Sequence, residues 1–176
     1  MDRSELAAAI YRTSLRIGTF QLRSGRTATE YFDKYRFESD PVLLRAVAEQ
    51  AADHIPPDTE MLAGLELGGV PVATALALES GLPVVFVRKA AKAYGTGRLA
   101  EGADVAGRRV LVVEDVITSG GQVASSTADL RELGAVIDEA LCIVDREEGG
   151  AQNLAKHGLK LSALFTADEL RAAENP

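Results

Sequence analysis

The stretch that decides the fold is Arg109-Val110-Leu111-Val112-Val113-Glu114-Asp115-Val116-Ile117-Thr118-Ser119-Gly120-Gly121. Its continuous apolar, mostly β-branched beginning is typical of a central strand that is covered on both faces of a parallel sheet. Two acids, two hydroxyl residues and two glycines follow. Helix signals then run from Gln122 to Leu133 and stop at Gly134. The order of strand, polar turn and helix places these polar residues at the carboxyl end of a buried strand.

Strand and helix signals alternate along the rest of the chain from Ser39 onward. Further strands are expected at 61–65, 83–87, 136–144 and 159–165. Further helices are expected at 39–54, 69–80 and 149–157. Such alternation predicts an α/β domain with a doubly wound, Rossmann-like and mostly parallel sheet. In this architecture the ligand crevice lies beyond the carboxyl ends of the strands.

The first 38 residues are organised differently from the alternating part. They are expected to form a helix at 4–15, a short strand at 19–22, a basic turn at 23–26 and an extended aromatic segment at 31–37. We interpret residues 1–38 as a small amino-terminal hood on a core of residues 39–176, all within one domain. Residues 89–107 have three glycines and little apolar periodicity, so a flexible loop is expected there.

Composition limits the kinds of partner. The 176 residues are 47% hydrophobic and 26% charged, as in soluble globular domains, and the net charge is -7. This charge argues against broad binding to nucleic acid or anionic membrane, and no apolar run is long enough to span a bilayer. We therefore expect a cytoplasmic protein. The single cysteine, Cys142, lies in an apolar stretch and is expected to be a buried structural thiol.

A polyanionic small molecule would need a local group of cations in so acidic a chain. Arg88, Lys89, Lys92 and Arg98 provide one, with no acid among them. A solvated surface turn is the other interpretation of these residues.

The residues after the strand suit a sugar phosphate. Glu114 and Asp115 can direct their oxygens at two neighbouring hydroxyls, either directly or through magnesium. Thr118-Ser119 offers hydroxyls, Gly120-Gly121 lets the backbone approach closely, and the next helix directs its positive end inward. The stretch is neither a Walker loop nor a dinucleotide fingerprint. An ordinary polar turn is the alternative.

Residues 112–121 resemble the phosphoribosyl pyrophosphate (PRPP) motif of type I phosphoribosyltransferases. Other segments resemble orotate phosphoribosyltransferases in particular. Residues 87–95, with Glu101-Gly102, are similar to the Arg-Lys-x-x-Lys-x-His-Gly catalytic loop of that family. Residues 22–26 and 31–33 are similar to its orotate-binding stretch, and Asp145-Arg146 matches its carboxylate-binding arginine. The resemblance extends over residues 19–146.

The resemblance implies a role for each matching residue. Glu114 and Asp115 would bind the ribose hydroxyls and, with Lys92, would be the catalytic residues. The 5′-phosphate would be bound by Val116, Ile117, Thr118, Ser119, Gly120, Gly121 and Gln122. Pyrophosphate would meet Arg88, Lys89, Lys92 and Tyr94. Orotate would meet Arg23, Tyr31, Phe32, Thr118 and Arg146.

The resemblance also implies a reaction and its partners. Orotate and PRPP would give orotidine 5′-phosphate, with Mg²⁺ held mainly by the substrate rather than by protein ligands. The chain would form a homodimer whose loops reach into the neighbouring site. Two residues depart from the family pattern, because Tyr94 replaces a histidine and Gly68 replaces a frequent lysine. A purine or uracil phosphoribosyltransferase and a non-catalytic PRPP-binding regulator remain alternatives.

Overall fold

The structure is a computed structural model that describes residues 1–21, 25, 27–90 and 99–174. Its centre is a six-stranded sheet in the order β5-β4-β3-β6-β7-β8. Every neighbouring pair in this sheet is parallel except β4 and β5. The strands are β3 (Met61–Leu65), β4 (Val84–Val87), β5 (Ala100–Gly102), β6 (Val110–Ile117), β7 (Glu139–Asp145) and β8 (Lys160–Thr166).

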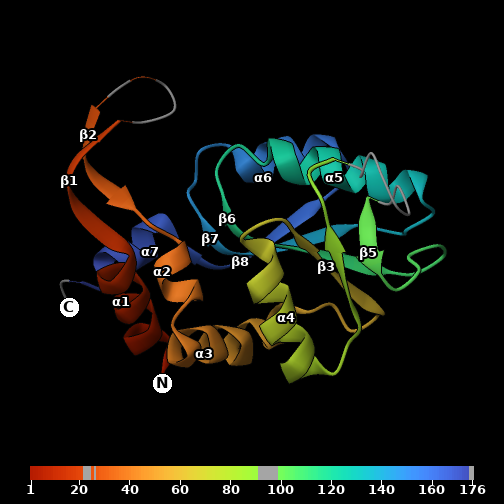
Figure 1. The fold of residues 1–176 in the computed structure, drawn as a ribbon, viewed down its shortest axis with the longest axis horizontal. Coiled ribbons are helices and arrows are strands. Elements are labelled where there is room, and N and C mark those ends of the chain that lie inside the picture. Colours follow the sequence, from red (N-terminus) through yellow and green to blue (C-terminus); the bar gives the residue numbers. More distant parts are fainter. Residues whose placement is uncertain (22–24, 26, 91–98, 175–176) are drawn as a thin grey trace.

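Helices cover both faces of the sheet, as the alternating pattern predicted. Two helices, α5 (Gly121–Glu132) and α6 (Gly150–Lys156), lie on one face (Figure 1). The opposite face is covered by α1 (Arg3–Ser14), α3 (Pro41–Ala51) with the short η1 (Ala52–His54), α4 (Gly69–Ser80) and α7 (Ala167–Ala172). The predicted doubly wound α/β architecture is therefore confirmed.

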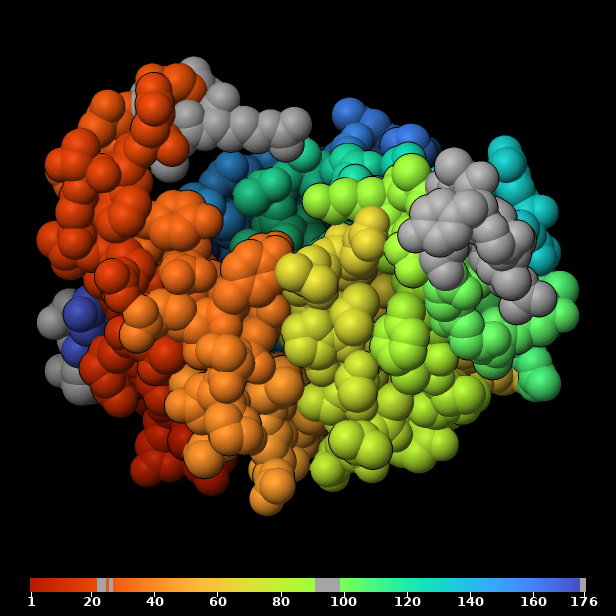
Figure 2. Space-filling model, in the orientation of Figure 1, coloured from red at the N-terminus to blue at the C-terminus, as the bar shows by residue number. Residues whose placement is uncertain are grey.

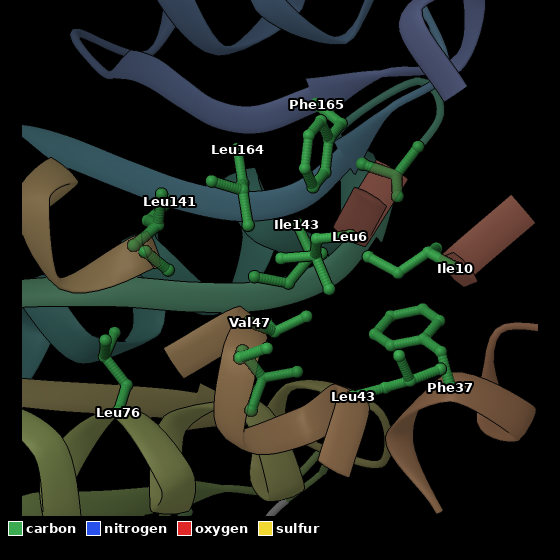
Figure 3. Close-up of a cluster of buried hydrophobic side chains, with 14 of the residues drawn as sticks. Leu6, Ile10, Phe37, Leu43, Val47, Leu76, Leu141, Ile143, Leu164 and Phe165 are labelled. Atoms are coloured by element: carbon green, nitrogen blue, oxygen red, sulfur yellow. The ribbon is translucent and has the colours of Figure 1, made fainter. Parts of the chain in front are cut away.

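Alternate residues of the central strands enter two hydrophobic clusters, one on each face. On β6, Leu111 and Val113 point to the face of α3 and α4, whereas Val110 and Val112 point to the face of α5 and α6. Figure 3 shows the first cluster, in which Leu141 and Ile143 of β7 lie opposite side chains of α1, α3 and α4. Cys142, the next residue in alternation, is fully buried in the second cluster, as expected from its apolar surroundings.

Within residues 1–38, a hairpin and a short helix follow α1. Strands β1 (Leu15–Gln21) and β2 (Thr27–Phe32) pair antiparallel and project from the body of the molecule, at the upper left of Figures 1 and 2. The prediction of one extended segment at 31–37 is wrong, because β2 ends at Phe32 and α2 (Tyr35–Glu38) follows. The Asp33 amide donates to the Ser14 carbonyl at 2.8 Å, which closes the base of the hairpin.

Three other expectations need correction. Strand β6 continues to Ile117, so that Glu114 and Asp115 lie inside the strand instead of after it. Residues 89–107 include a strand, β5, whereas we expected only a loop. Helix α7 was not predicted, although Thr166 and Glu169 form a capping box at its start. None of the helices among the described residues is long and apolar enough to cross a membrane.

Candidate active site

The site lies where the direction of chain winding reverses. From β3 the chain passes through α4 to β4 on one side, whereas from β6 it passes through α5 to β7 on the other (Figure 1). The carboxyl ends of β3 and β6 therefore lie side by side with their connections leading away, which opens a crevice between them. Glu66 to Gly68 follow β3, and Thr118 to Gly120 follow β6.

A polar hollow of about 290 Å³ lies at the end of β6. Gly120 makes the turn into α5 with φ of 71°, a left-handed conformation that favours glycine. The Asn153 side chain donates to the Ser119 carbonyl at 2.9 Å and so secures the loop from α6. Backbone amides at the start of a helix attract phosphate. The lining residues are Glu114, Val116, Ile117, Thr118, Ser119, Gly120, Gly121, Gln122 and Val123.

The structure thus brings together all the predicted ribose- and phosphate-binding residues except Asp115. The Asp115 side chain is fully buried and pairs with Lys34, whose ammonium lies 2.9 Å from Oδ1 and 2.7 Å from Oδ2. Asp115 Oδ1 also accepts a hydrogen bond from the amide of Val116 at 2.5 Å. Sequence analysis missed Lys34, since no local pattern relates it to a residue 81 positions away.

Two further carboxyl groups, those of Glu38 and Glu114, surround Asp115. Burial, and then the neighbouring Asp115, raises the pKa of both Glu38 and Glu114 to about 9. Burial opposes ionisation of Asp115 as well, but hydrogen bonds with Glu114, Glu38 and Lys34 lower its pKa. Asp115 is therefore the ionised member of the cluster at neutral pH, whereas Glu38 and Glu114 are protonated.

The cluster explains sterically why position 68 is a glycine. A Cβ atom placed on Gly68 would lie 1.6 Å from Asp115 Oδ2, which is far inside van der Waals contact. No side chain fits at this position while Asp115 keeps its place.

Three of the predicted orotate-binding residues line a second hollow, of about 180 Å³. Tyr31 and Phe32 come from β2 of the hood, and Arg146 follows β7. Tyr31 also packs against Phe20 with ring centroids 5.5 Å apart. The Arg146 guanidinium pairs with Glu148 at 3.1 Å on the surface. Thr118 lines the phosphate hollow, and Arg23 lies outside the described residues.

The hollow at Arg146 adjoins the phosphate-binding turn through the backbone. The Arg146 amide donates to the Ile117 carbonyl at 2.9 Å, which joins the residue after β7 to the end of β6. A ring compound bound beside Arg146 and a phosphate bound at the start of α5 would therefore occupy neighbouring positions.

The predicted pyrophosphate-binding residues are only partly described. Arg88 follows β4 and its Nε lies 3.4 Å from Glu101 Oε1. The Lys89 amide donates to Glu66 Oε1 at 2.6 Å, and Lys89 lines a different hollow with Leu99 and Asp129. Neither cation lines the phosphate hollow of its own chain. Lys92 and Tyr94 lie outside the described residues.

The donors present do not suit a metal ion bound by the protein alone. Among residues 1–21, 25, 27–90 and 99–174, no group of three or more His, Cys, Asp or Glu side chains could hold one. Asp115 is already paired with Lys34. A magnesium ion coordinated by substrate phosphates and water is compatible with this arrangement.

The fold and the polar turn at the switch point of the doubly wound sheet are of the kind expected in proteins that bind a sugar phosphate. The phosphoribosyl transferase domain family matches residues 37–168. Orotate phosphoribosyltransferase from Nocardioides sp. is 52% identical over 168 residues, which cover 96% of this chain and 94% of that protein.

Solved structures agree with this match. The crystal structure of Mycobacterium tuberculosis orotate phosphoribosyltransferase in complex with Fe(III) dicitrate has a TM-score of 0.87 and 34% identity, covering 97% of this chain and 99% of that one. The same enzyme in complex with PRPP has a TM-score of 0.83 and 30% identity, with the same coverage. The chain therefore belongs to the orotate phosphoribosyltransferases, enzymes that transfer a phosphoribosyl group from PRPP to orotate in pyrimidine biosynthesis.

Proposed function

We propose that this chain converts orotate and PRPP to orotidine 5′-phosphate and pyrophosphate, with the residues of the two adjoining hollows as its binding site. The observation that supports this most strongly is the hydrogen bond from the Arg146 amide to the Ile117 carbonyl, because it joins the residue proposed to bind a carboxylate to the strand end that precedes the phosphate-binding turn. A guanidinium binds a carboxylate through two parallel hydrogen bonds. Adenine, hypoxanthine and uracil have no carboxylate, so Arg146 favours orotate among the possible bases.

Each part of PRPP has proposed partners. The residues from Val116 to Gln122 would donate hydrogen bonds to the 5′-phosphate, and the start of α5 would add its favourable dipole. Glu114 and Asp115 would accept hydrogen bonds from the ribose hydroxyls. Tyr31, Phe32 and Thr118 would bind the orotate ring, together with Arg23.

The leaving group would be stabilised by cations. Lys92 is the proposed catalytic residue of the 89–107 segment, and Arg88, Lys89 and Tyr94 would also contact pyrophosphate. We propose that some residues of this segment serve the neighbouring subunit of a homodimer, as the resemblance of residues 87–95 to the family's catalytic loop implies. Bound Mg²⁺ would neutralise negative charge on the pyrophosphate. A cytoplasmic location and the limits 1–38 and 39–176 stay predictions.

The test is a base panel. Purified protein would be mixed with magnesium, PRPP and orotate, adenine, hypoxanthine or uracil in turn, and nucleotide product would be measured. We expect product with orotate alone. Turnover of another base without orotate would contradict the proposal in favour of a different phosphoribosyltransferase. PRPP binding without turnover of any base would support a regulator instead.

A further inference from the structure

A polar residue of α6, Asn153, hydrogen-bonds to the phosphate-binding turn, Thr118 to Gly120. The side-chain amide of Asn153 donates to the Ser119 carbonyl at 2.9 Å. Among the described residues, no other donor reaches this carbonyl. The described residues that line the phosphate hollow include none of α6. Asn153 therefore holds the turn from the side that faces away from the hollow.

Helix α6 packs closely enough against the turn to make this contact a fixed one. A Cβ atom on Gly150 would lie 2.7 Å from the Thr118 carbonyl oxygen. A Cβ atom on Gly120 would lie 3.0 Å from Leu154. Figure 1 shows α6 beside α5, the helix that the turn begins. Asn153 thus donates its hydrogen bond from a rigid element that touches the turn on either side of Ser119.

The turn does not fix its own central peptide. Gly120 has φ of 71° and ψ of 5°, the conformation of the third residue of a type II turn. Rotation of the Ser119–Gly120 peptide plane would give a type I turn, in which the third residue has φ of about −90°. Glycine adopts positive and negative φ almost equally well. A contact from outside the turn is therefore needed to select one orientation, and Asn153 supplies it.

The orientation of this peptide decides what the turn presents to an anion. The C=O and N–H groups of a trans peptide point in opposite directions. Because Asn153 holds the Ser119 carbonyl on the side of α6, the Gly120 N–H is directed away from α6, toward the hollow. This N–H has no acceptor among the described residues. In the rotated peptide a carbonyl oxygen would replace it, and a carbonyl oxygen repels phosphate.

We propose that Asn153 is a positioning residue: its hydrogen bond to Ser119 keeps the Gly120 N–H directed at the 5′-phosphate of PRPP. The inference rests on the proposed phosphate-binding role of the turn, but it does not depend on which base is used. Asn153 acts through the Ser119–Gly120 peptide and does not itself touch the substrate.

The first test measures binding of inorganic phosphate, and of PRPP with magnesium, to variants of the full chain. Asn153→Leu keeps a side chain of similar size but removes the donor, and Asn153→Ala removes most of the side chain. Gln152→Ala is the matched control, since Gln152 is an exposed residue of the same helix. Calorimetry would give the dissociation constants, and urea unfolding would give the stability of each variant.

In both Asn153 variants we expect the dissociation constants of phosphate and PRPP to rise by about fivefold to tenfold, because a hydrogen bond to a charged group is weakened. Gln152→Ala should bind both ligands as the unmodified chain does. Unchanged affinity in the Asn153 variants would overturn the proposal, and so would a loss that affects PRPP but not phosphate. Should Asn153→Leu be unstable, Asn153→Ala permits the same comparison.

A second test separates positioning from a general structural role. In the ¹⁵N NMR spectrum of the unmodified chain, saturating phosphate should move the Gly120 amide proton downfield, since that N–H gains an anionic acceptor. The shift should be smaller in Asn153→Leu at saturation. Equal shifts in the two proteins would mean that the peptide is oriented without Asn153, which overturns the proposal even if affinity has fallen.

The proposed function fails in a different way. If the unmodified chain bound neither phosphate nor PRPP, the phosphate-binding role of the turn would be contradicted, and this inference with it. Normal binding by the unmodified chain and by both Asn153 variants would contradict this inference alone.

Discussion

Arg146, which we propose recognises orotate, has a fixed backbone and an exposed side chain that can change partners. Its amide bonds to Ile117, but its guanidinium pairs with Glu148 in a contact where both side chains are about half exposed. Exposed ion pairs contribute little to stability. Binding of an orotate carboxylate could therefore replace Glu148 at small cost.

We expect Arg146→Ala to raise the KM for orotate by at least about tenfold and to leave PRPP affinity nearly unchanged, because a charged hydrogen-bonded pair is lost on one substrate only. Steady-state kinetics with each substrate varied in turn would measure this. Arg45→Ala, at an exposed position of α3, is the control. An equal loss for both substrates would show that Arg146 does not select the base.

Glu38 should make the stability of the protein depend on pH. Its pKa rises from the ordinary 4.5 to about 9 on folding, so between these values the folded chain binds more protons than the unfolded one. The contribution of Glu38 to stability is then fully present below pH 4.5 and is lost as pH rises toward 9, with a slope of up to about 1.4 kcal/mol per pH unit.

A glutamine at position 38 cannot ionise. We therefore expect the free energy of unfolding of Glu38→Gln to increase relative to that of the unmodified chain as pH increases from 5 to 9. Urea unfolding at several pH values would measure the difference, in comparison with Glu49→Gln on the exposed face of α3. Parallel curves for Glu38→Gln and the unmodified chain would contradict a raised pKa.

For individual residues, the sequence predicted those proposed to surround phosphate and base, because they follow one another in short motifs. It did not predict Lys34 or Glu38 as part of the site. Charged residues are seldom buried, and nothing local indicates that Glu38 is an exception. Their roles arise from contacts with a strand about 80 residues away, which only the folded chain brings near.

At the scale of elements, the junction of β6 and α5 is the most constrained part of the site. Gly120 caps α5 in a left-handed conformation, and a Cβ there would lie 3.0 Å from Leu154 of α6. The phosphate-binding turn, Thr118 to Gly120, is thus packed between α5 and α6, which cover the same face of the sheet.

Gly120→Ala should lower the free energy of unfolding by about 1–2 kcal/mol, the cost of a left-handed alanine, and should also weaken binding of PRPP and inorganic phosphate. Gly81→Ala is a matched control, since Gly81 has a similar φ of 75° but nothing within 4 Å of the added carbon. We expect Gly81→Ala to lose comparable stability and no affinity. Denaturant unfolding and calorimetry would measure both effects, and equal affinity in the two variants would contradict the assigned role of the turn.

The order of elements was predictable because buried strands and capped helices alternate clearly from Ser39 onward. The boundaries of the elements were harder to predict where two patterns overlap. Apolar Val116 and Ile117 continue β6 past the two acids, which we had taken as its end. Residues 31–37 are aromatic enough for a strand, but the Asp33 bond to Ser14 ends β2 and lets α2 begin. That hydrogen bond is a tertiary contact, which local sequence patterns do not predict.

For the molecule as a whole, the proposed homodimer, whose loops would reach into the neighbouring site, leads to a complementation experiment. Lys92→Ala and Asp115→Asn chains would each be inactive alone. In hybrid dimers that exchange loops, one of the two sites would have both residues intact.

Random assembly makes half of the dimers hybrid, so about a quarter of full activity should return when the two inactive chains are refolded together. Activity assays at several mixing ratios would measure the recovery. Two chains that both carry Lys92→Ala serve as the control and should stay inactive. Failure of the mixed pair to recover activity would show that each loop serves its own chain.

The three residues of β5 have a consequence for solubility. They pair antiparallel with β4 and form the last strand on that side of the sheet, at the end of the basic connection that begins at Arg88. A strand so short offers little backbone to a passing chain, whereas an uncovered β4 would present a template for edge-to-edge aggregation. The connection proposed to bind pyrophosphate therefore also shields the sheet from self-association. Deletions meant to probe its chemistry should end before Leu99, so that the shield stays in place.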